Sequence, residues 1–197
     1  MQDRLIMVWK NVAKRLHGTF EQKKDTDYFH NHEAYELTCH YDKHKVIVTA
    51  YLQLIPERGR GPFLTHFTKV YVCFYNQQKV YFKIAKNSFL SSICNLISPQ
   101  IKTPNSTFNK RFNLSGQPRF KVASIFSNQE ILQPIVDFDD IYLEVIHNNK
   151  FASSFAPPNN EDVLEVNVNY VLNNEEQILN LIHLSTLLVE EVTSIRI

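Results

Sequence analysis

Hydrophobic and polar residues alternate most regularly between Leu64 and Ala85. On either side of a polar break at 76–78, one alternating set is apolar and comprises Val70, Val72, Phe74, Val80, Phe82 and Ile84. The other set is mostly lysine and tyrosine and comprises Lys69, Tyr71, Cys73, Tyr75, Lys79, Tyr81 and Lys83. Because side chains alternate between the two faces of a strand, this pattern predicts a β-hairpin with one apolar face. That face must be covered, so we expect the hairpin at the centre of an antiparallel sheet with helices on one side.

Hydrophobic periodicity also predicts the other elements of the first half. Apolar residues at helical spacing predict an amphipathic helix over 4–16 that stops at Gly18. Its basic outer face would suit an anionic membrane surface, but its short apolar stripe favours docking onto the sheet. The remaining expectations are a polar connection over 19–33, strands over 34–41 and 44–55, an exposed loop over 56–62 and a helix from 87 or 88 to 97.

The segment 98–107 contains two prolines and few apolar residues. It is the predicted linker between a basic N-terminal half, 1–97, and a C-terminal half, 108–197, which either form separate domains or share one continuous sheet. For the second half we expect a strand over 107–114, a turn at 115–118 and a helix from Ser127 to about 138 that contains Pro134. Three strands should follow over 140–147, 150–156 and 163–172, and the first two of them should pair as a hairpin. The last expected element is a long helix capped by Asn173 or Asn174. Each half therefore consists of strands followed by a helix, which predicts an α+β fold with helices on one sheet face.

Charge is distributed very unevenly along the chain. Residues 1–121 contain 19 Lys plus Arg and 8 Asp plus Glu, whereas residues 122–197 contain 2 and 12, although the whole chain has a net charge of +1. The two regions can pair within one molecule, pair between molecules, or attract different partners. Pairing within the monomer is the default expectation.

The lysine and tyrosine face suggests one type of binding site. Single-stranded nucleic acid binds such faces because bases stack on aromatic rings and phosphates need cations. The candidate residues for binding nucleic acid or another polyanion are Lys45, Tyr51, Lys69, Tyr71, Tyr75, Lys79, Tyr81 and Lys83. Solvated strands commonly carry the same residue types, so a purely structural role stays open.

A histidine cluster suggests a second type of site. Two histidines separated by one residue project to the same side of an extended segment, as metal sites often require. The candidate ligands of a metal-dependent enzyme are His30, His32, His40 and His44. These residues lie in a polar connection and at a strand turn, where exposed histidines are also common.

Other chemical motifs are absent from the sequence. Asp137, Asp139 and Asp140 lie together at a helix-strand junction, where carboxylates usually solvate a loop. There is no nucleophile elbow, phosphate-binding glycine loop or CxxC pair, so no catalytic residue and no cofactor are expected.

Three cysteines without metal-ligand spacing indicate reduced thiols and a cytoplasmic protein, and no apolar run is long enough to span a membrane. We therefore expect a non-catalytic cytoplasmic module that associates with a protein partner or with itself. Polyanion binding and a metal-dependent enzyme are the two alternatives.

Overall fold

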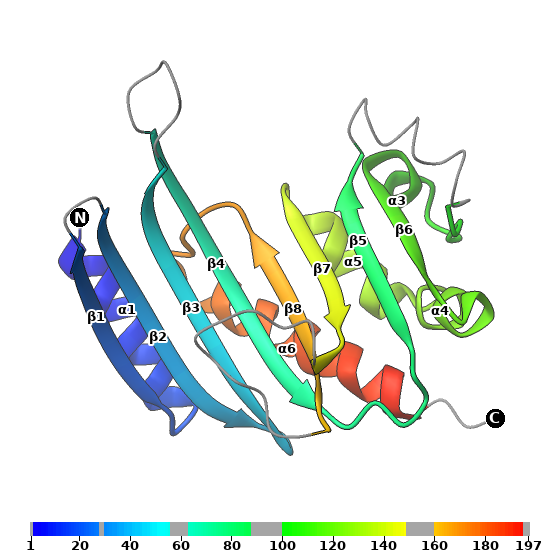
Figure 1. Ribbon diagram of the computed structural model, residues 1–197, viewed down its shortest axis with the longest axis horizontal. Coiled ribbons are helices and arrows are strands. Elements are labelled where there is room, and N and C mark those ends of the chain that lie inside the picture. The colour runs from blue at the N-terminus through cyan, green and yellow to red at the C-terminus, as the bar shows by residue number, and fades with distance from the viewer. Residues whose placement is uncertain (1, 28–29, 56–62, 88–99, 149–159, 195–197) are drawn as a thin grey trace.

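The computed structural model describes residues 2–27, 30–55, 63–87, 100–148 and 160–194. Eight antiparallel strands form one sheet in the order β1-β2-β3-β4-β8-β7-β5-β6 (Figure 1). The strands are β1 (Thr19–Asp27), β2 (His30–Tyr41), β3 (His44–Ile55), β4 (Phe63–Phe74), β5 (Tyr81–Lys86), β6 (Phe112–Gln117), β7 (Ile141–Ile146) and β8 (Asp162–Val168). The sheet therefore contains strands from both sides of the predicted linker.

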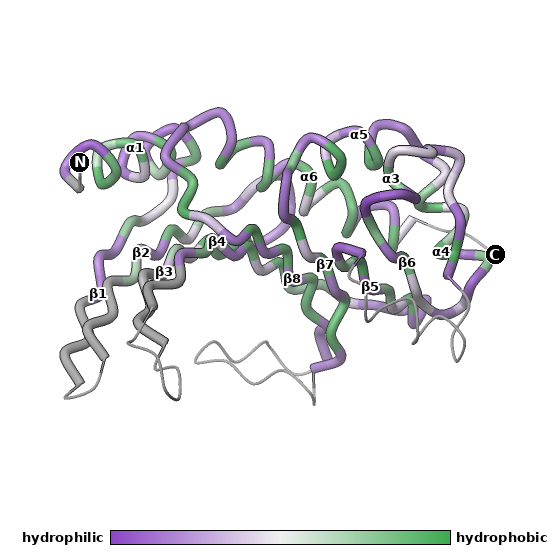
Figure 2. Tube along the Cα trace, turned by 90° about the horizontal axis from the view of Figure 1, so that it is seen from above, coloured by the Kyte–Doolittle hydropathy of each residue, from purple (hydrophilic) through white to green (hydrophobic). Residues whose placement is uncertain are grey.

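The described helices are α1 (Gln2–Arg15), α3 (Ser106–Arg111), α4 (Arg119–Ile125), α5 (Gln129–Asp137) and α6 (Glu175–Ser194). Seen along the sheet edge, α1, α6 and α5 lie on the same side of the sheet (Figure 2). The predicted α+β fold with an antiparallel sheet is confirmed. Within the described ranges, no helix is long and apolar enough to cross a membrane.

The division of side chains between the two sheet faces follows the predicted alternation. All six apolar residues of the alternating set between Val70 and Ile84 are buried, with exposed fractions of 0–3%. They belong to a core that also contains seven buried apolar residues of α6 and the docked face of α1. The indole of Trp9 on α1 is fully buried, and its Nε1 donates a hydrogen bond to the Leu172 carbonyl at 3.0 Å. Helix α1 therefore packs on the molecule's own core, as expected.

The predicted hairpin is wrong, although both of its strands exist. Strands β4 and β5 do not pair with each other, because β8 and β7 lie between them. Val70 pairs with Val166 of β8, and Ile84 pairs with Leu143 of β7. The alternation determined which face each side chain occupies, but period-two patterning carries no information about the neighbouring strand.

Two further segments differ from their predictions. Residues 19–27 form edge strand β1 rather than a polar connection, and β1 pairs with β2 along its whole length. Residues 106–111 form α3, although a strand was expected from 107 onward, because the Asn105 side chain accepts a hydrogen bond from the Phe108 amide and caps the helix. The following strand, β6, covers most of the predicted turn at 115–118, and α4 was not predicted.

Other predicted elements are confirmed or lie outside the described residues. The long C-terminal helix begins after Asn174, whose side chain accepts a hydrogen bond from the Glu176 amide at 2.8 Å. Helix α5 is present, but its cap is Asn128 rather than Ser127. The expected loop over 56–62, the helix at 88–97 and the strand at 150–156, together with its hairpin, lie outside the described part of the chain.

The described part of the predicted linker packs against the core. The buried side chain of Ile101 belongs to the main core, and the Ile101 amide donates to the Leu114 carbonyl at 2.8 Å. Gln100 Nε2 also donates to the Phe112 carbonyl at 2.7 Å. This part of the chain therefore packs along β6.

Candidate functional site

Six of the eight predicted polyanion-binding residues lie on strands at alternate positions that face away from the helices. These are Lys45, Tyr51, Lys69, Tyr71, Tyr81 and Lys83, although the partly buried side chain of Tyr81 also packs against the main core. Tyr75 and Lys79 lie in the connection after β4. Tyr71 is only 7% exposed and packs with Ile47 and Val163, and burial raises the pKa of its hydroxyl. Its ring is therefore not available to stack on a base.

Acidic side chains from the second half of the chain lie among these lysines. Lys69 Nζ is 2.9 Å from a Glu165 oxygen, with side chains 25% and 13% exposed. Lys83 Nζ is 3.5 Å from Glu144 and 5.0 Å from the centre of the Tyr142 ring. These contacts arise because β7 and β8 lie between β4 and β5. Both lysines are thus already neutralised by neighbouring carboxylates.

Tyr81 also has an acidic partner from the second half. Burial, and next a hydrogen bond to Asp162, raise the pKa of Tyr81 to about 12. Asp162 is itself 6% exposed and accepts a hydrogen bond from Asn76 Nδ2 at 2.9 Å. The Tyr81 hydroxyl is therefore part of an internal network.

Among the described residues, four ion pairs join a cation before residue 122 to an anion after it. They are Lys69 with Glu165, Lys83 with Glu144, Lys43 with Glu190 at 3.9 Å and Arg111 with Asp139 at 3.8 Å. The default expectation that opposite charges pair within the molecule is confirmed for these residues.

The predicted metal ligands are spread along β2 and the start of β3. His32 and His40 are eight residues apart on β2, which corresponds to roughly 26 Å of strand. His44 belongs to the alternating set of β3 that faces the helices, whereas His40 lies at an exposed position of the opposite set on β2. No group of three metal-binding side chains occurs among the residues that the structure describes.

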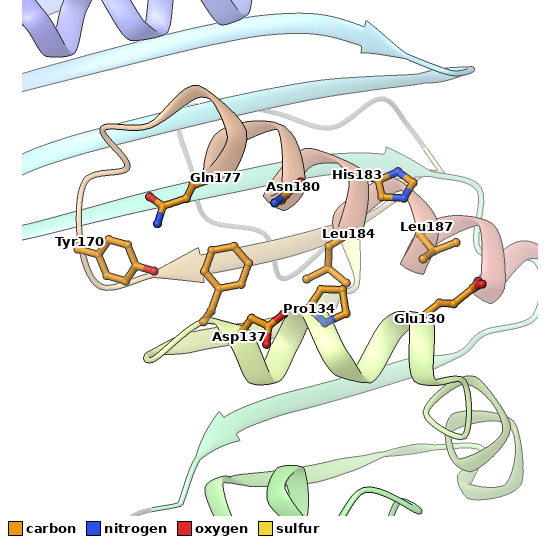
Figure 3. Close-up of a pocket in the computed structure, with 10 residues that line it drawn as sticks. Glu130, Pro134, Asp137, Tyr170, Gln177, Asn180, His183, Leu184 and Leu187 are labelled. Atoms are coloured by element: carbon orange, nitrogen blue, oxygen red, sulfur yellow. The ribbon is translucent and has the colours of Figure 1, made fainter.

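The helix layer contains a groove that was not predicted. It lies between α5 and α6, with a volume of about 330 Å³, which is within the range of small ligand pockets (Figure 3). Helix α5 contributes Glu130, Pro134 and Asp137; α6 contributes Gln177, Asn180, His183, Leu184 and Leu187; Phe138 and Tyr170 complete the lining. The groove thus combines an apolar part with acidic and amide side chains.

The position of α5 is fixed at both of its ends. At its start, Asn128 accepts a hydrogen bond from the Glu130 amide at 2.9 Å. At its end, the Arg111 guanidinium donates to the carbonyls of Val136 and Phe138, the latter at 2.8 Å. The positive charge of Arg111 also interacts favourably with the negative C-terminal end of the helix dipole. Asp137 and Phe138 are therefore held where they line the groove.

The opposite wall depends on the fully buried hydroxyl of Thr68. This hydroxyl donates to the Tyr170 carbonyl at 2.9 Å and accepts from the Leu172 amide at 3.0 Å. The two bonds fasten the segment that leads from β8 to α6. Burial, and next the charges of Asp139 and Asp140, raise the pKa of the Tyr170 hydroxyl, so it stays a neutral hydrogen-bond donor.

The groove carries two carboxylates that can accept hydrogen bonds from a ligand. The carboxylates of Glu130 and Asp137 are both exposed, and their positions are about 10 Å apart along α5. Gln133 donates to one Asp137 oxygen at 2.8 Å, and the other oxygen remains an acceptor. Pro134 has no amide hydrogen, so the Glu130 carbonyl lacks its usual partner within the helix. The groove is therefore suited to a group that is cationic and partly apolar.

Two features of the sequence point to this groove. Pro134 interrupts a helical pattern, and the carboxylates around Asp137 follow that pattern directly. Such a run of carboxylates usually solvates a loop, and the residues of α6 that face it are about 40 positions away in the sequence. Comparison with protein-family models, curated proteins and solved structures finds no match.

Proposed function

We propose that this protein is a non-catalytic module that acts by binding a protein partner, and that the groove between α5 and α6 accepts a basic, partly apolar segment of that partner. The observation that carries this proposal is the combination of two exposed carboxylates with an apolar lining in one groove of about 330 Å³. A lysine or arginine beside an aromatic or aliphatic side chain satisfies both parts.

The charges on the sheet face favour this groove over polyanion binding. Lys69 and Lys83 already have carboxylate partners, and releasing them for phosphate would leave Glu165 and Glu144 beside the bound anion. Glu130 and Asp137 have no ion-pair partner among the described residues. A cation that binds in the groove therefore replaces no existing ion pair there.

The contacts of the groove support binding rather than catalysis. Among its described residues, no hydrogen bond joins the His183 ring to a hydroxyl or a carboxylate, which a nucleophile-base pair requires. The ring instead packs edge-on against Tyr41, with centroids 6.2 Å apart.

We further propose a cytoplasmic location, supported by free thiols at Cys39 and Cys73. Burial raises the pKa of both thiols to about 11, which keeps them protonated and unreactive.

The test uses short labelled peptides of three compositions and the folded full-length chain. We expect peptides containing both arginine and phenylalanine to bind more tightly than peptides in which glutamate replaces arginine or serine replaces phenylalanine. Fluorescence anisotropy measures the affinity, and amide chemical shifts locate the site. Glu130→Gln with Asp137→Asn should weaken binding of the arginine-phenylalanine peptide about tenfold. Equal binding of the three peptides, or shifts confined to the sheet face, would contradict the proposal.

A further inference from the structure

The outer face of helix α1 is basic and takes no part in the packing of the fold. The helix docks through Trp9, Val12 and Ala13, which are buried in the core. Its other side carries four exposed cations, which are Arg4, Lys10, Lys14 and Arg15. None of the four has a carboxylate partner within the part of the chain that the structure describes. This positive charge is therefore available to an external partner.

An exposed methionine lies in the middle of this charge. The side chain of Met7 is 62% exposed, although methionine is among the residues most often buried. Residues three positions apart are neighbours on a helix surface, so Arg4 and Lys10 flank Met7 on its two sides. The two cations are six residues apart, which corresponds to about 9 Å along the helix axis. Arg4, Met7 and Lys10 thus form a basic-apolar-basic group, which we call the α1 segment.

The α1 segment is held by contacts on both sides of the helix. Trp9 Nε1 donates to the Leu172 carbonyl at 3.0 Å, and Asn11 Nδ2 donates to Glu175 Oε1 at 2.8 Å. Both acceptors lie at or just before the start of α6. The backbone of the α1 segment is therefore already ordered, and a partner that binds it pays no cost for folding this helix.

The α1 segment matches the groove between α5 and α6 in charge, chemical type and spacing. The carboxylates of Glu130 and Asp137 are about 10 Å apart along α5, which is close to the spacing of the two cations. Pro134 lies between these two carboxylates, and Leu184 and Leu187 of α6 line the opposite wall (Figure 3). An apolar side chain between two cations therefore meets an apolar lining between two carboxylates.

We propose that a second copy of this chain fills the groove with its α1 segment. Arg4 and Lys10 of one copy meet the two carboxylates of the other, and Met7 enters the apolar part of the groove. The inference rests on the proposed function, because it identifies the basic, partly apolar segment of the partner as part of the chain itself.

The positions of the two surfaces favour a closed pair. Helices α1, α5 and α6 lie on the same side of the sheet (Figure 2). When two copies face each other with these sides, one two-fold axis brings the α1 segment of each copy to the groove of the other. The same contact then forms twice. Its ion pairs are exposed, so the association is weak and decreases as salt rises.

Sedimentation velocity of the full chain tests this association. In about 50 mM salt we expect the average mass to rise from 23.1 kDa towards twice that value between about 10 and 500 μM chain, and to rise less in about 500 mM salt. Arg4→Glu with Lys10→Glu should weaken association about tenfold or more. Met7→Gln keeps the length of the side chain but removes its apolar character, and it should weaken association about fivefold or more.

Two lysines outside both surfaces provide the matched control. Lys79 and Lys86 are exposed and do not line the groove, so Lys79→Glu with Lys86→Glu makes the same change in net charge elsewhere on the molecule. This control should associate nearly as well as the wild type. A strict monomer at low salt, or equal effects of the two pairs of substitutions, would overturn the inference.

Charge exchange between the two surfaces gives a rescue experiment. Arg4→Glu with Lys10→Glu should be monomeric alone, because its glutamates face the carboxylates of the groove. Glu130→Lys with Asp137→Lys should also be monomeric alone, because its lysines face the cations of the α1 segment. Mixed together, the two variants should form a one-to-one complex, since each contact again joins opposite charges. Absence of that complex, with wild-type association intact, would show that these surfaces do not meet.

Two further measurements distinguish failure of this inference from failure of the proposed function. Arginine-phenylalanine peptides compete for the same groove, so they should lower the average mass of the wild-type chain at low salt. If these peptides bind in the groove while the chain stays monomeric, the groove accepts a foreign segment and the second-copy inference is wrong. If neither the peptides nor a second copy binds there, both proposals are wrong.

A membrane is the other surface that a basic helix face can contact. Vesicles containing phosphatidylserine test it by co-sedimentation with the full chain. If the vesicles bind a chain that does not self-associate, and Arg4→Glu with Lys10→Glu abolishes this binding, the outer face of α1 contacts anionic lipid and the second-copy inference is wrong.

Discussion

The hydroxyl of Thr68 offers a sharp test of what holds the groove in place. Thr68→Val keeps the shape of the side chain but removes both of its hydrogen bonds, to the Tyr170 carbonyl and from the Leu172 amide. Leaving a buried polar group without a partner costs about 1–3 kcal/mol. Two such groups, one of them only partly buried, should lower the free energy of unfolding by about 2–4 kcal/mol.

Urea denaturation measures this effect. With a slope of about 2–3 kcal/mol per molar, the midpoint should fall by roughly 1 M while the slope stays unchanged. Thr49→Val is the matched control. Thr49 is also buried, at 3% exposed, but its hydroxyl has no hydrogen-bond partner among the described residues. Its replacement should be neutral or slightly stabilising. Equal effects of the two substitutions would refute the reasoning, because they share the same change in side-chain shape.

Two further predictions concern pH and backbone contact. Burial, and next the charge of Lys43, lower the pKa of His44 below its usual value of 6.5. Between the pKa of His44 in the folded chain and its pKa in the unfolded chain, the unfolded chain therefore binds more protons than the folded chain. Stability should therefore fall as pH drops below about 6.5, and urea midpoints at several pH values should show a smaller fall for His44→Gln; an identical profile would contradict this assignment. Gly18→Ala should destabilise by about 1–3 kcal/mol, because a Cβ there would lie 2.5 Å from the Thr38 carbonyl oxygen. Thermal unfolding measures this loss. The control His17→Gly should be neutral or stabilising, since His17 has a φ of 51°, which glycine adopts more easily than histidine. An unchanged melting temperature for Gly18→Ala would contradict the prediction, because it would show that the backbone moves to accommodate the Cβ.

Local sequence patterns predicted which sheet face a side chain occupies better than they predicted which strands lie next to each other. The alternation from Val70 to Ile84 correctly identified which side chains are buried. It could not show that the partner of Val70 is Val166, almost 100 residues later, because any apolar alternating strand satisfies the same rule.

Short ambiguous segments account for other differences. Phe108 and Phe112 fit one face of a strand, but they are also four residues apart, which is close to one helical turn. The Asn105 side chain accepts a hydrogen bond from the Phe108 amide, and this cap places Phe108 in a helix. Strand β1 contains one aromatic residue, Phe20, and many charged ones, which is usual for an edge strand and resembles a polar connection.

The candidate groove could be predicted only in part. A helix with an internal proline and a nearby group of carboxylates were both evident from the sequence. Their position opposite His183 and Leu184 depends on how α6 packs across the sheet, which no local pattern specifies.

The place of β8 in the sheet has a consequence for synthesis on the ribosome. Strand β4 ends at Phe74, and its partner strand begins at Asp162, so the outer edge of β4 is complete roughly 90 residues before its partner is made. At about 5–20 residues per second, the nascent chain carries an unpaired strand edge for on the order of 5–20 s. During that interval the β4 edge is open to pairing with another nascent chain, so a chaperone that covers this edge would protect the chain from aggregation.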